Sequence, residues 1–253
     1  NIRRVCLTAK SGLKYDHVAI AFSGGVDSSY LLYAAKQYAK EVCAYYANAE
    51  FQPAFELEDA VRLAKELDVR LEILELNILA VSHVSDNPSN RCYYCKRAIF
   101  TAITNAALKD GFSVLLDGTN ASDDTASRPG TKALQELSVL SPLRGCGLTK
   151  EAIRKLSREA NLFTWDKPAY ACLATRIATD EQITPEKLAA TEASEAFLHS
   201  LGFTDFRVRM QDGNAKIQLT EKDFPLLLQH RRLILEKLSS YYKSVVLDLE
   251  VRG

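Results

Sequence analysis

A glycine-rich turn near the amino end carries the clearest chemical signal in this sequence. Residues 23–28 read Ser-Gly-Gly-Val-Asp-Ser, between an apolar run at 17–22 and a helical pattern that starts at Ser28. Glycines let the backbone approach a ligand closely, and the N–H groups of a helix's first turn attract an anion. The segment therefore predicts a phosphate-binding loop, although it lacks the Lys-Ser/Thr pair of the Walker A motif. The alternative is an ordinary Gly-Gly turn between a strand and a helix.

Asp27 is the one acidic residue in this loop. A bound pyrophosphate would repel its carboxylate unless a cation lay between them. We therefore expect Asp27 to contact Mg²⁺ or a basic neighbour. The alternative is a simple cap for the helix that follows.

A second polar segment, Asp117-Gly-Thr-Asn120, follows another apolar run, and Asp123, Asp124 and Arg128 come soon after it. Gly118 would let a planar ligand approach, and the Arg128 guanidinium could bind a phosphate or a carboxylate. Asn48 holds the same kind of position after a different apolar run. These residues predict further parts of a ligand site, and a solvated turn is the alternative.

Three cysteines form a candidate sulfur or metal site. Cys92 and Cys95 make a Cys-x-x-Cys pair, and Cys172 lies near Arg176, whose charge would favour a thiolate. Three thiolates could hold a [4Fe–4S] cluster and leave one iron without a protein ligand. Two alternatives stay open: a dithiol at a helix start with no metal, and Cys172 as a lone reactive nucleophile.

A basic pattern occurs late in the chain. Arg207 and Arg209 alternate with apolar residues, which places both side chains on one face of a strand, and Lys216 falls on the expected partner strand. This face could bind a phosphate or a carboxylate, or it could simply be solvated.

The elements that must position these residues alternate between strand and helix over the first two-thirds of the chain. We expect strands at 17–22, 41–47, 70–76, 113–117 and 138–141, with helices between them. This order predicts a parallel α/β sheet whose ligands lie beyond the carboxyl ends of the strands. After a loop, residues 182–253 read as a small α+β domain, so the expected domains are 1–181 and 182–253.

Composition limits the class of protein. The chain has 253 residues, with 32 basic and 32 acidic residues, so it offers no overall basic charge for nucleic acid. No apolar stretch is long enough to span a membrane, and the first residues are too weakly apolar for a signal peptide. Six cysteines are too few for a disulfide scaffold. We expect a cytoplasmic protein with neither a membrane nor a nucleic-acid partner.

Taken together, these segments resemble the LarE family, sulfur insertases of the ATP pyrophosphatase (PP-loop) superfamily. The resemblance implies a Rossmann-like, HUP-type PP-loop domain. It spans nearly the whole chain and is most specific around Cys172. The matching segments are Ser23–Ser28, 90–96, 117–120, 128–130, 140–143, 147–154, 165–169, Ala171-Cys-Leu-Ala-Thr-Arg176, 183–188, 201–203 and 207–209.

The resemblance implies an ATP-dependent sulfurtransferase that serves the biosynthesis of the nickel-pincer nucleotide of lactate racemase. A carboxylate of a pyridinium dicarboxylate mononucleotide attacks the α-phosphate of ATP, pyrophosphate leaves, and sulfur then displaces AMP to give a thiocarboxylate. The sulfur comes from Cys172, which ends as dehydroalanine, or from a [4Fe–4S] cluster on Cys92, Cys95 and Cys172. We favour the cluster because all three cysteines are present. The resemblance also implies a homo-oligomer.

The expected roles follow from these matches. Cys172, Asp27 and Arg176 would be catalytic, with Mg²⁺ as the metal that accompanies ATP. Arg128, Arg207 and Arg209 would bind the substrate. ATP would be bound by Ala21, Phe22, Ser23, Gly24, Gly25, Val26, Asp27, Ser28, Asn48, Gly118, Thr119 and Asn120.

Two segments depart from the family pattern. After Arg176 the chain has Ile177-Ala-Thr-Asp180 where the family usually has Pro-Tyr-Gly, and Ala215-Lys-Ile-Gln218 replaces Ala-Arg-Ile-Glu.

The runner-up function is a PP-loop enzyme that thiolates tRNA, which predicts salt-sensitive RNA binding. Amide-forming relatives are another alternative, but they need an ammonia source and no reactive cysteine, so the loop that carries Cys172 counts against them. A nucleotide-binding regulator without turnover would be indifferent to the loss of Cys172.

Overall fold

The computed structural model describes residues 16–124 and 129–252 of the chain, which divides into two compact units. The first comprises Asn1–Val81 and Asn90–Tyr170, and the second comprises Ser82–Ser89 and Ala171–Gly253. In this division the chain passes from the first unit to the second after Tyr170, so Cys172 belongs to the second unit.

The first unit contains a four-stranded, all-parallel sheet in the order β3-β2-β1-β4. Its strands are β1 (His17–Ala21), β2 (Glu41–Ala49), β3 (Arg70–Leu76) and β4 (Leu115–Leu116). These are four of the five strands expected from the sequence. The predicted parallel α/β architecture is confirmed.

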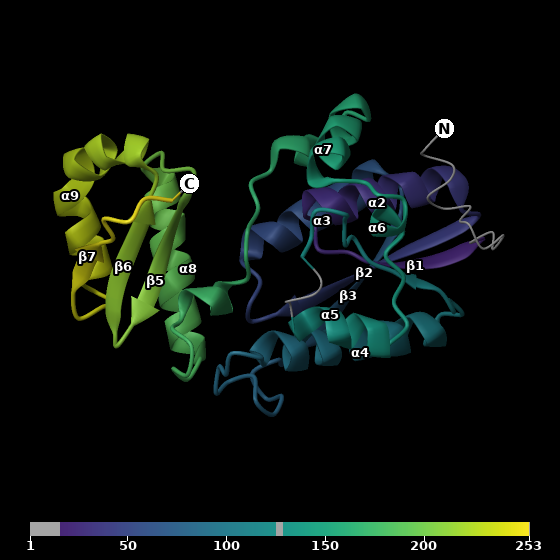
Figure 1. Cartoon of the computed structure of the whole chain (residues 1–253), viewed down its shortest axis with the longest axis horizontal. Helices are drawn as coiled ribbons and strands as arrows, with labels where there is room; N and C mark the ends of the chain where they lie inside the picture. The colour runs from purple at the N-terminus through teal and green to yellow at the C-terminus, as the bar shows by residue number, and fades with distance from the viewer. Residues whose placement is uncertain (1–15, 125–128, 253) are drawn as a thin grey trace. The chain divides into compact units, whose positions relative to one another are not determined.

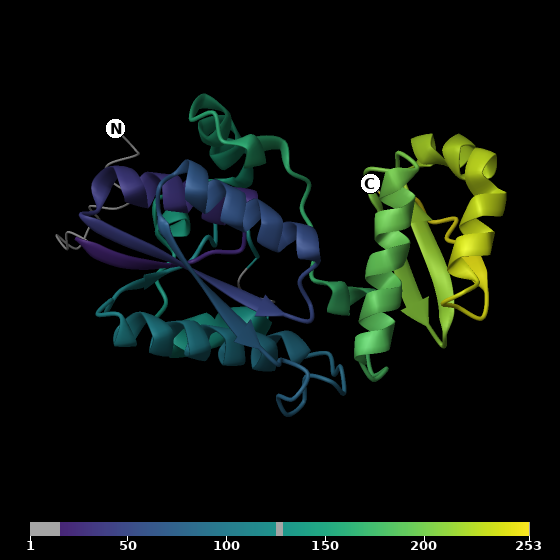
Figure 2. The same ribbon diagram turned by 180° about the vertical axis from the view of Figure 1, so that it is seen from behind.

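Helices cover both faces of this sheet. On one face lie α2 (Val26–Tyr38), α3 (Ala54–Glu66), the short α6 (Pro142–Gly145) and α7 (Lys150–Glu159). On the other lie α4 (Arg91–Lys109) and α5 (Pro129–Glu136), as Figure 1 and, from behind, Figure 2 show. The two-sided cover explains why β2 reads as a continuous apolar run: Ala44 and Tyr46 pack in the core beneath α2, whereas Cys43 and Tyr45 pack in the core beneath α4.

The expected fifth strand, at 138–141, is reduced to one residue. Leu140 bridges Leu116 in parallel, and its backbone bonds to Leu115 and Asp117. Pro142 then opens α6, and a proline cannot extend the ladder of hydrogen bonds. The segment therefore pairs once with β4 and turns away.

The second unit has a three-stranded sheet in the order β5-β6-β7, backed by two helices. Its elements are α8 (Pro185–Ser200), β5 (Phe206–Gln211), β6 (Asn214–Leu219), α9 (Phe224–Leu238) and β7 (Val245–Leu247). Thr184 caps α8 by accepting a hydrogen bond from the backbone N–H of Lys187. Val208 and Ile217 lie in this unit's core.

Residues just after Cys172 join this second unit through backbone bonds. The Ala178 N–H donates to the Met210 carbonyl, and Ile177 forms a bridge with Met210 at the edge of β5. The buried Asn87 amide donates to the Ala178 carbonyl. These bonds explain why Ala171–Gly253 and Ser82–Ser89 form one unit. No helix among the described residues is long and apolar enough to cross a membrane.

Candidate functional site

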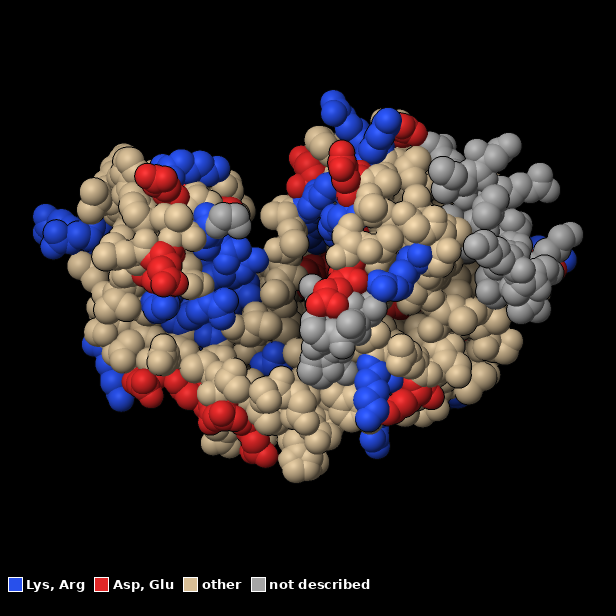
Figure 3. Space-filling view, viewed as in Figure 1, with Lys and Arg blue, Asp and Glu red and all other residues tan. Residues whose placement is uncertain are grey.

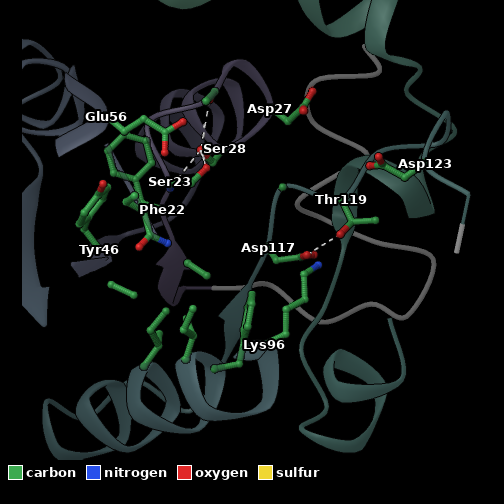
Figure 4. A pocket seen from close by; sticks show the side chains of 18 residues that line it. Phe22, Ser23, Asp27, Ser28, Tyr46, Glu56, Lys96, Asp117, Thr119 and Asp123 are labelled. Atoms are coloured by element: carbon green, nitrogen blue, oxygen red, sulfur yellow. Dashed lines mark hydrogen bonds between the residues drawn. The ribbon is translucent and has the colours of Figure 1, made fainter. Parts of the chain in front are cut away.

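A cavity of about 360 Å³ lies at the carboxyl ends of β1, β2 and β4, where the parallel sheet predicts a ligand site (Figure 4). The expected site residues that line it are Ala21, Phe22, Ser23, Gly25, Asp27, Ser28, Gly118 and Thr119. Tyr46, Ala47, Gln52, Glu56, Lys96, Ile99, Phe100, Ile103, Asp117 and Asp123 complete the lining. The cavity thus brings together the glycine-rich loop and the polar segment after β4.

The loop at 23–28 is held by its own serines. Ser28 Oγ accepts a hydrogen bond from the Ser23 N–H at 3.3 Å and donates to the Gly25 carbonyl at 3.1 Å. The two hydroxyl oxygens lie 3.1 Å apart (Figure 4). Gly25 is the N-cap of α2 and supplies no side-chain cap, so the first N–H groups of α2 remain available to an anion. The arrangement suits a phosphate group.

Gly118 approaches this loop so closely that no side chain fits there. A Cβ at this position would lie 2.9 Å from the Ser28 nitrogen and 3.2 Å from the Asp27 carbonyl carbon. Both are backbone atoms at the start of α2, which cannot move without displacing the loop. The sequence predicted that Gly118 lets a planar ligand approach, which stays a prediction; the close contact that the structure shows at Gly118 is with the phosphate loop itself.

Replacing Gly118 with alanine should displace the loop, destabilise the first unit by about 1–3 kcal/mol and weaken nucleotide binding. Thermal unfolding and calorimetric titration with ATP would measure the two effects. Gly145→Ala is the matched control, because a Cβ there meets no atom within 4 Å. Equal ATP affinity in the two variants would contradict this account of Gly118.

Asp27 has a basic neighbour, one of the two partners expected for it. Lys150 Nζ lies 2.5 Å from Asp27 Oδ2, and both side chains are partly buried. Burial raises the pKa of Asp27 above its ordinary value, and the nearby Asp123 carboxylate raises it further. The contact with Lys150 lowers this pKa but does not outweigh burial. The other oxygen, Asp27 Oδ1, is buried without a hydrogen-bond partner. A buried carboxylate oxygen of this kind, facing a phosphate cradle, fits a cation brought by the ligand.

The segment after β4 is fixed by hydrogen bonds. The buried Asp117 carboxylate accepts from the hydroxyls of Thr119 and Ser141, each at 2.5 Å. Asn120 is also buried, and its backbone N–H donates to Asp123. Lys96 extends from α4 toward Asp117 in Figure 4.

The remaining expected ATP contacts lie beside the cavity without lining it. Gly24, Val26 and Asn120 belong to the same segments, and the Asn48 amide donates to both Glu75 oxygens, at 3.0 and 2.9 Å. Arg128 lies outside the described residues. Sequence reasoning missed Lys150, Lys96, Tyr46 and Gln52. Lys96 and Lys150 lie within the segments 90–96 and 147–154 that resemble the LarE family, and Tyr46 lies near the carboxyl end of a buried strand, but Gln52 had no signal.

Cys92 and Cys95 lie in the first turns of α4, in the first unit. Cys92 is exposed, and an Arg91 guanidinium nitrogen lies 3.7 Å from its sulfur. Within the described part of the chain, no group of three or more His, Cys, Asp or Glu side chains is arranged to hold a metal ion. The first unit thus presents two of the three expected thiols, and the third, Cys172, belongs to the second unit.

Cys172 is partly buried and directly precedes a short 3-10 helix, Leu173–Arg176. Its carbonyl accepts from the Thr175 hydroxyl at 2.8 Å. The same hydroxyl accepts from Arg176, which also donates to the Ala171 carbonyl at 3.1 Å. The Arg176 guanidinium therefore binds the Ala171 carbonyl directly. It also reaches the Cys172 carbonyl indirectly, through the Thr175 hydroxyl.

Arg176 is buried because a carboxylate is buried with it. Its Nε and Nη2 bind the two oxygens of Glu195, at 2.7 and 3.1 Å. Glu195 also accepts from the Val208 N–H on β5 at 3.0 Å. These contacts connect the cysteine loop, through Arg176 and Glu195, to α8 and β5.

Arginines gather on one face of the second unit's sheet. In the pairing of β5 with β6, Arg207 lies opposite Gln218 and Arg209 opposite Lys216, as the alternation predicted. Burial lowers the pKa of Arg207 and of Arg209, and the nearby Arg176 and Arg252 lower both further. Figure 3 shows Lys and Arg side chains gathered on this unit. Such crowding of positive charge favours binding of an anion.

Comparison with known proteins agrees with this arrangement. The family model for the queuosine biosynthesis protein QueC matches residues 17–87, which include the phosphate loop. A pyridinium-3,5-bisthiocarboxylic acid mononucleotide synthase of Lactiplantibacillus plantarum is 32% identical over 92% of this chain and 85% of its own length. This chain belongs to the LarE family. An uncharacterised protein of Synechocystis is 33% identical over 93% of the chain and 89% of its own length. A tRNA-specific 2-thiouridylase of Thermotoga neapolitana is 24% identical over 78% of the chain and 69% of its own length.

The two departures from the LarE pattern have structural partners in this chain. Ile177, in place of the family's proline, is buried and pairs with the edge of β5. Gln218, in place of the family's acid, accepts from Arg209 at 2.6 Å and donates to Asp248 at 2.8 Å. Asp248 also pairs with Lys216, so it supplies an acid to the basic face.

Proposed function

We propose that this chain is an ATP-dependent sulfur transferase that converts a carboxylate of pyridinium-3,5-biscarboxylic acid mononucleotide into a thiocarboxylate, for nickel-pincer nucleotide biosynthesis. The observation that carries the proposal is the match, over 92% of the chain, to a synthase whose name gives the bisthiocarboxylic acid product. A phosphate loop whose serines are preorganised supports the use of ATP.

The first step would be adenylation. A substrate carboxylate oxygen attacks the α-phosphorus of ATP, the bond to the bridging oxygen breaks, and pyrophosphate leaves into the loop. The N–H groups at the start of α2 and the hydroxyls of Ser23 and Ser28 would stabilise the departing charge. Asp27 would hold Mg²⁺, which would supply positive charge beside the phosphates. Lys150 keeps the Asp27 carboxylate oriented.

The second step would transfer sulfur. The Cys172 thiolate attacks the carbonyl carbon of the acyl adenylate and AMP leaves. Loss of the Cys172 α-proton to a base then breaks the Cβ–S bond, which yields the thiocarboxylate and dehydroalanine. The alternative source is sulfide on a cluster held by Cys92, Cys95 and Cys172. Because the described residues present no group of three or more potential ligands, we derive no step through that cluster.

The substrate's phosphate would be bound by Arg207 and Arg209 on the basic face of the second unit. Their pKa values are lowered by burial and by repulsion from Arg176 and Arg252, and a bound anion would offset that repulsion. Arg128 keeps its sequence-based assignment as a further substrate contact.

Incubation with ATP and the dicarboxylate mononucleotide should release pyrophosphate and AMP and give a thiocarboxylate product. Pyrophosphate release should require the mononucleotide, because its carboxylate is the attacking group. Intact protein mass and iron content, measured before and after turnover, separate the sulfur sources: iron-free protein that loses one H₂S used Cys172. Absence of any carboxylate-dependent pyrophosphate release would end the proposal.

A tRNA-thiolating activity is the second candidate, favoured by the 24% identity to the Thermotoga neapolitana thiouridylase. It predicts tRNA binding that weakens steeply as salt rises. The equal numbers of acidic and basic residues argue against it. Binding of tRNA that survives physiological salt, with no activity on the mononucleotide, would favour this candidate instead.

A further inference from the structure

Two polar atoms in the cavity are buried without hydrogen-bond partners. They are the hydroxyl oxygen of Tyr46 and the side-chain carbonyl oxygen of Gln52. Tyr46 is 1% exposed, and a buried hydroxyl without a partner costs free energy, so such groups normally have one. Both residues line a cavity of ligand size, which suggests that a ligand supplies the missing bonds.

The two residues come from the same part of the fold. Tyr46 lies near the carboxyl end of β2, and Gln52 lies in the turn that leads to α3, where its N–H donates to the Ala49 carbonyl. Figure 4 shows Tyr46, Phe22 and Glu56 on one side of the cavity, and Asp27, Thr119 and Asp123 on the other. The orphaned hydroxyl of Tyr46 is therefore on the side away from the acidic end of the phosphate loop.

Apolar side chains also line the cavity. Ala47 and the α4 residues Ile99, Phe100 and Ile103 contribute to it. Ligand cavities of this kind bind a planar apolar ring and orient it by a few polar atoms. Burial raises the pKa of the Tyr46 phenol, and the Glu56 carboxylate raises it further, so the hydroxyl keeps its proton.

We infer that Gln52 and Tyr46 recognise the base of the nucleotide as a 6-aminopurine, with the Gln52 side-chain oxygen accepting from the exocyclic amine and the Tyr46 hydroxyl donating to a ring nitrogen. The inference rests on the proposed use of ATP and adds the residues that select it. Adenine offers such a donor and acceptor side by side. A purine without the amine would leave the Gln52 oxygen buried and unpaired.

The decisive comparison is ATP against purine riboside triphosphate, which lacks only the exocyclic amine. Wild-type protein should bind ATP about tenfold to a hundredfold more tightly, because an unmade hydrogen bond to a buried group costs about 1–3 kcal/mol. Gln52→Met keeps the side-chain length and removes the acceptor. The affinities of this variant for the two nucleotides should lie within about threefold of each other. Its affinity for ATP should fall, whereas its affinity for purine riboside triphosphate should stay as in the wild-type protein. Calorimetric titration gives both affinities.

Two controls complete the experiment. Gln37 is an exposed glutamine of α2 outside the cavity, and Gln37→Met should keep the wild-type preference. Tyr46→Phe should weaken binding of both nucleotides about equally, because both retain the ring nitrogens, while Tyr38→Phe, at an exposed tyrosine, should change neither.

Equal affinity of the wild-type protein for the two nucleotides would overturn the inference, as would an ATP preference that persists in Gln52→Met. In both outcomes the protein still binds a nucleoside triphosphate, so the proposed function is not contradicted. Failure of the wild-type protein to bind any triphosphate would instead defeat the proposed function, and the inference with it. The wild-type comparison alone tests the inference if Gln52→Met does not fold.

Discussion

Replacing Cys172 with alanine should reduce thiocarboxylate formation below detection, a fall of at least about 10³-fold. Alanine carries no sulfur, so it neither attacks the acyl adenylate nor gives up a sulfur atom. Carboxylate-dependent pyrophosphate release in a single turnover should stay within about twofold of wild type, because the phosphate loop and its cavity belong to the first unit and Cys172 to the second. Radiolabelled pyrophosphate release and mass spectrometry of the product measure the two steps separately.

Cys146→Ala is the matched control for this substitution. Cys146 is also partly buried and also lies at the end of a short helical turn, but it belongs to the first unit and does not line the cavity. Its replacement should leave both steps unchanged. Thiocarboxylate formed by Cys172→Ala at the wild-type rate would refute every version of the proposed sulfur step, whether the sulfur comes from the cysteine or from a cluster that it helps to hold.

The regular elements that position the site follow from short-range patterns. Strands β1, β2 and β3 were predicted within two residues because each is a run rich in Val, Ile, Leu or Tyr, although β3 has no fully buried residue. The phosphate loop was recognisable because its function depends on backbone geometry, which a local Ser-Gly-Gly pattern specifies. Gly118 was expected to let a planar ligand approach, whereas its contact with the loop backbone was not foreseen.

Contacts between distant segments were harder to predict. Lys150 lies 123 residues after Asp27, and nothing in the local sequence of either residue names the other as its partner. The same holds for Arg176 and Glu195, whose pairing depends on how α8 packs beside the cysteine loop. The sequence predicted that Arg176 favours the thiolate form of Cys172, and this stays a prediction. The structure adds the bonds from Arg176 to Glu195, to the Ala171 carbonyl and to Thr175.

Those bonds predict a large effect on stability. Arg176→Met should lower the free energy of unfolding of the second unit by about 3–5 kcal/mol, because it leaves the Glu195 carboxylate buried without its cation. The side chains of Arg176 and Glu195 are only 1% and 7% exposed, so water cannot take the cation's place. Urea unfolding, with hydrogen exchange measured on peptides from β5, would report the loss in this unit.

The double variant Arg176→Met/Glu195→Met separates the buried charge from the lost packing. Removing both charges should recover part of the loss, since paired replacement of a buried ion pair by apolar residues is often neutral. Recovery should be incomplete, because the Val208 N–H loses its acceptor. Arg231→Met, at an exposed arginine of α9, should change stability by no more than about 0.5 kcal/mol. A double variant no more stable than Arg176→Met would mean that loss of the loop's backbone bonds, rather than an unpaired carboxylate, causes the destabilisation.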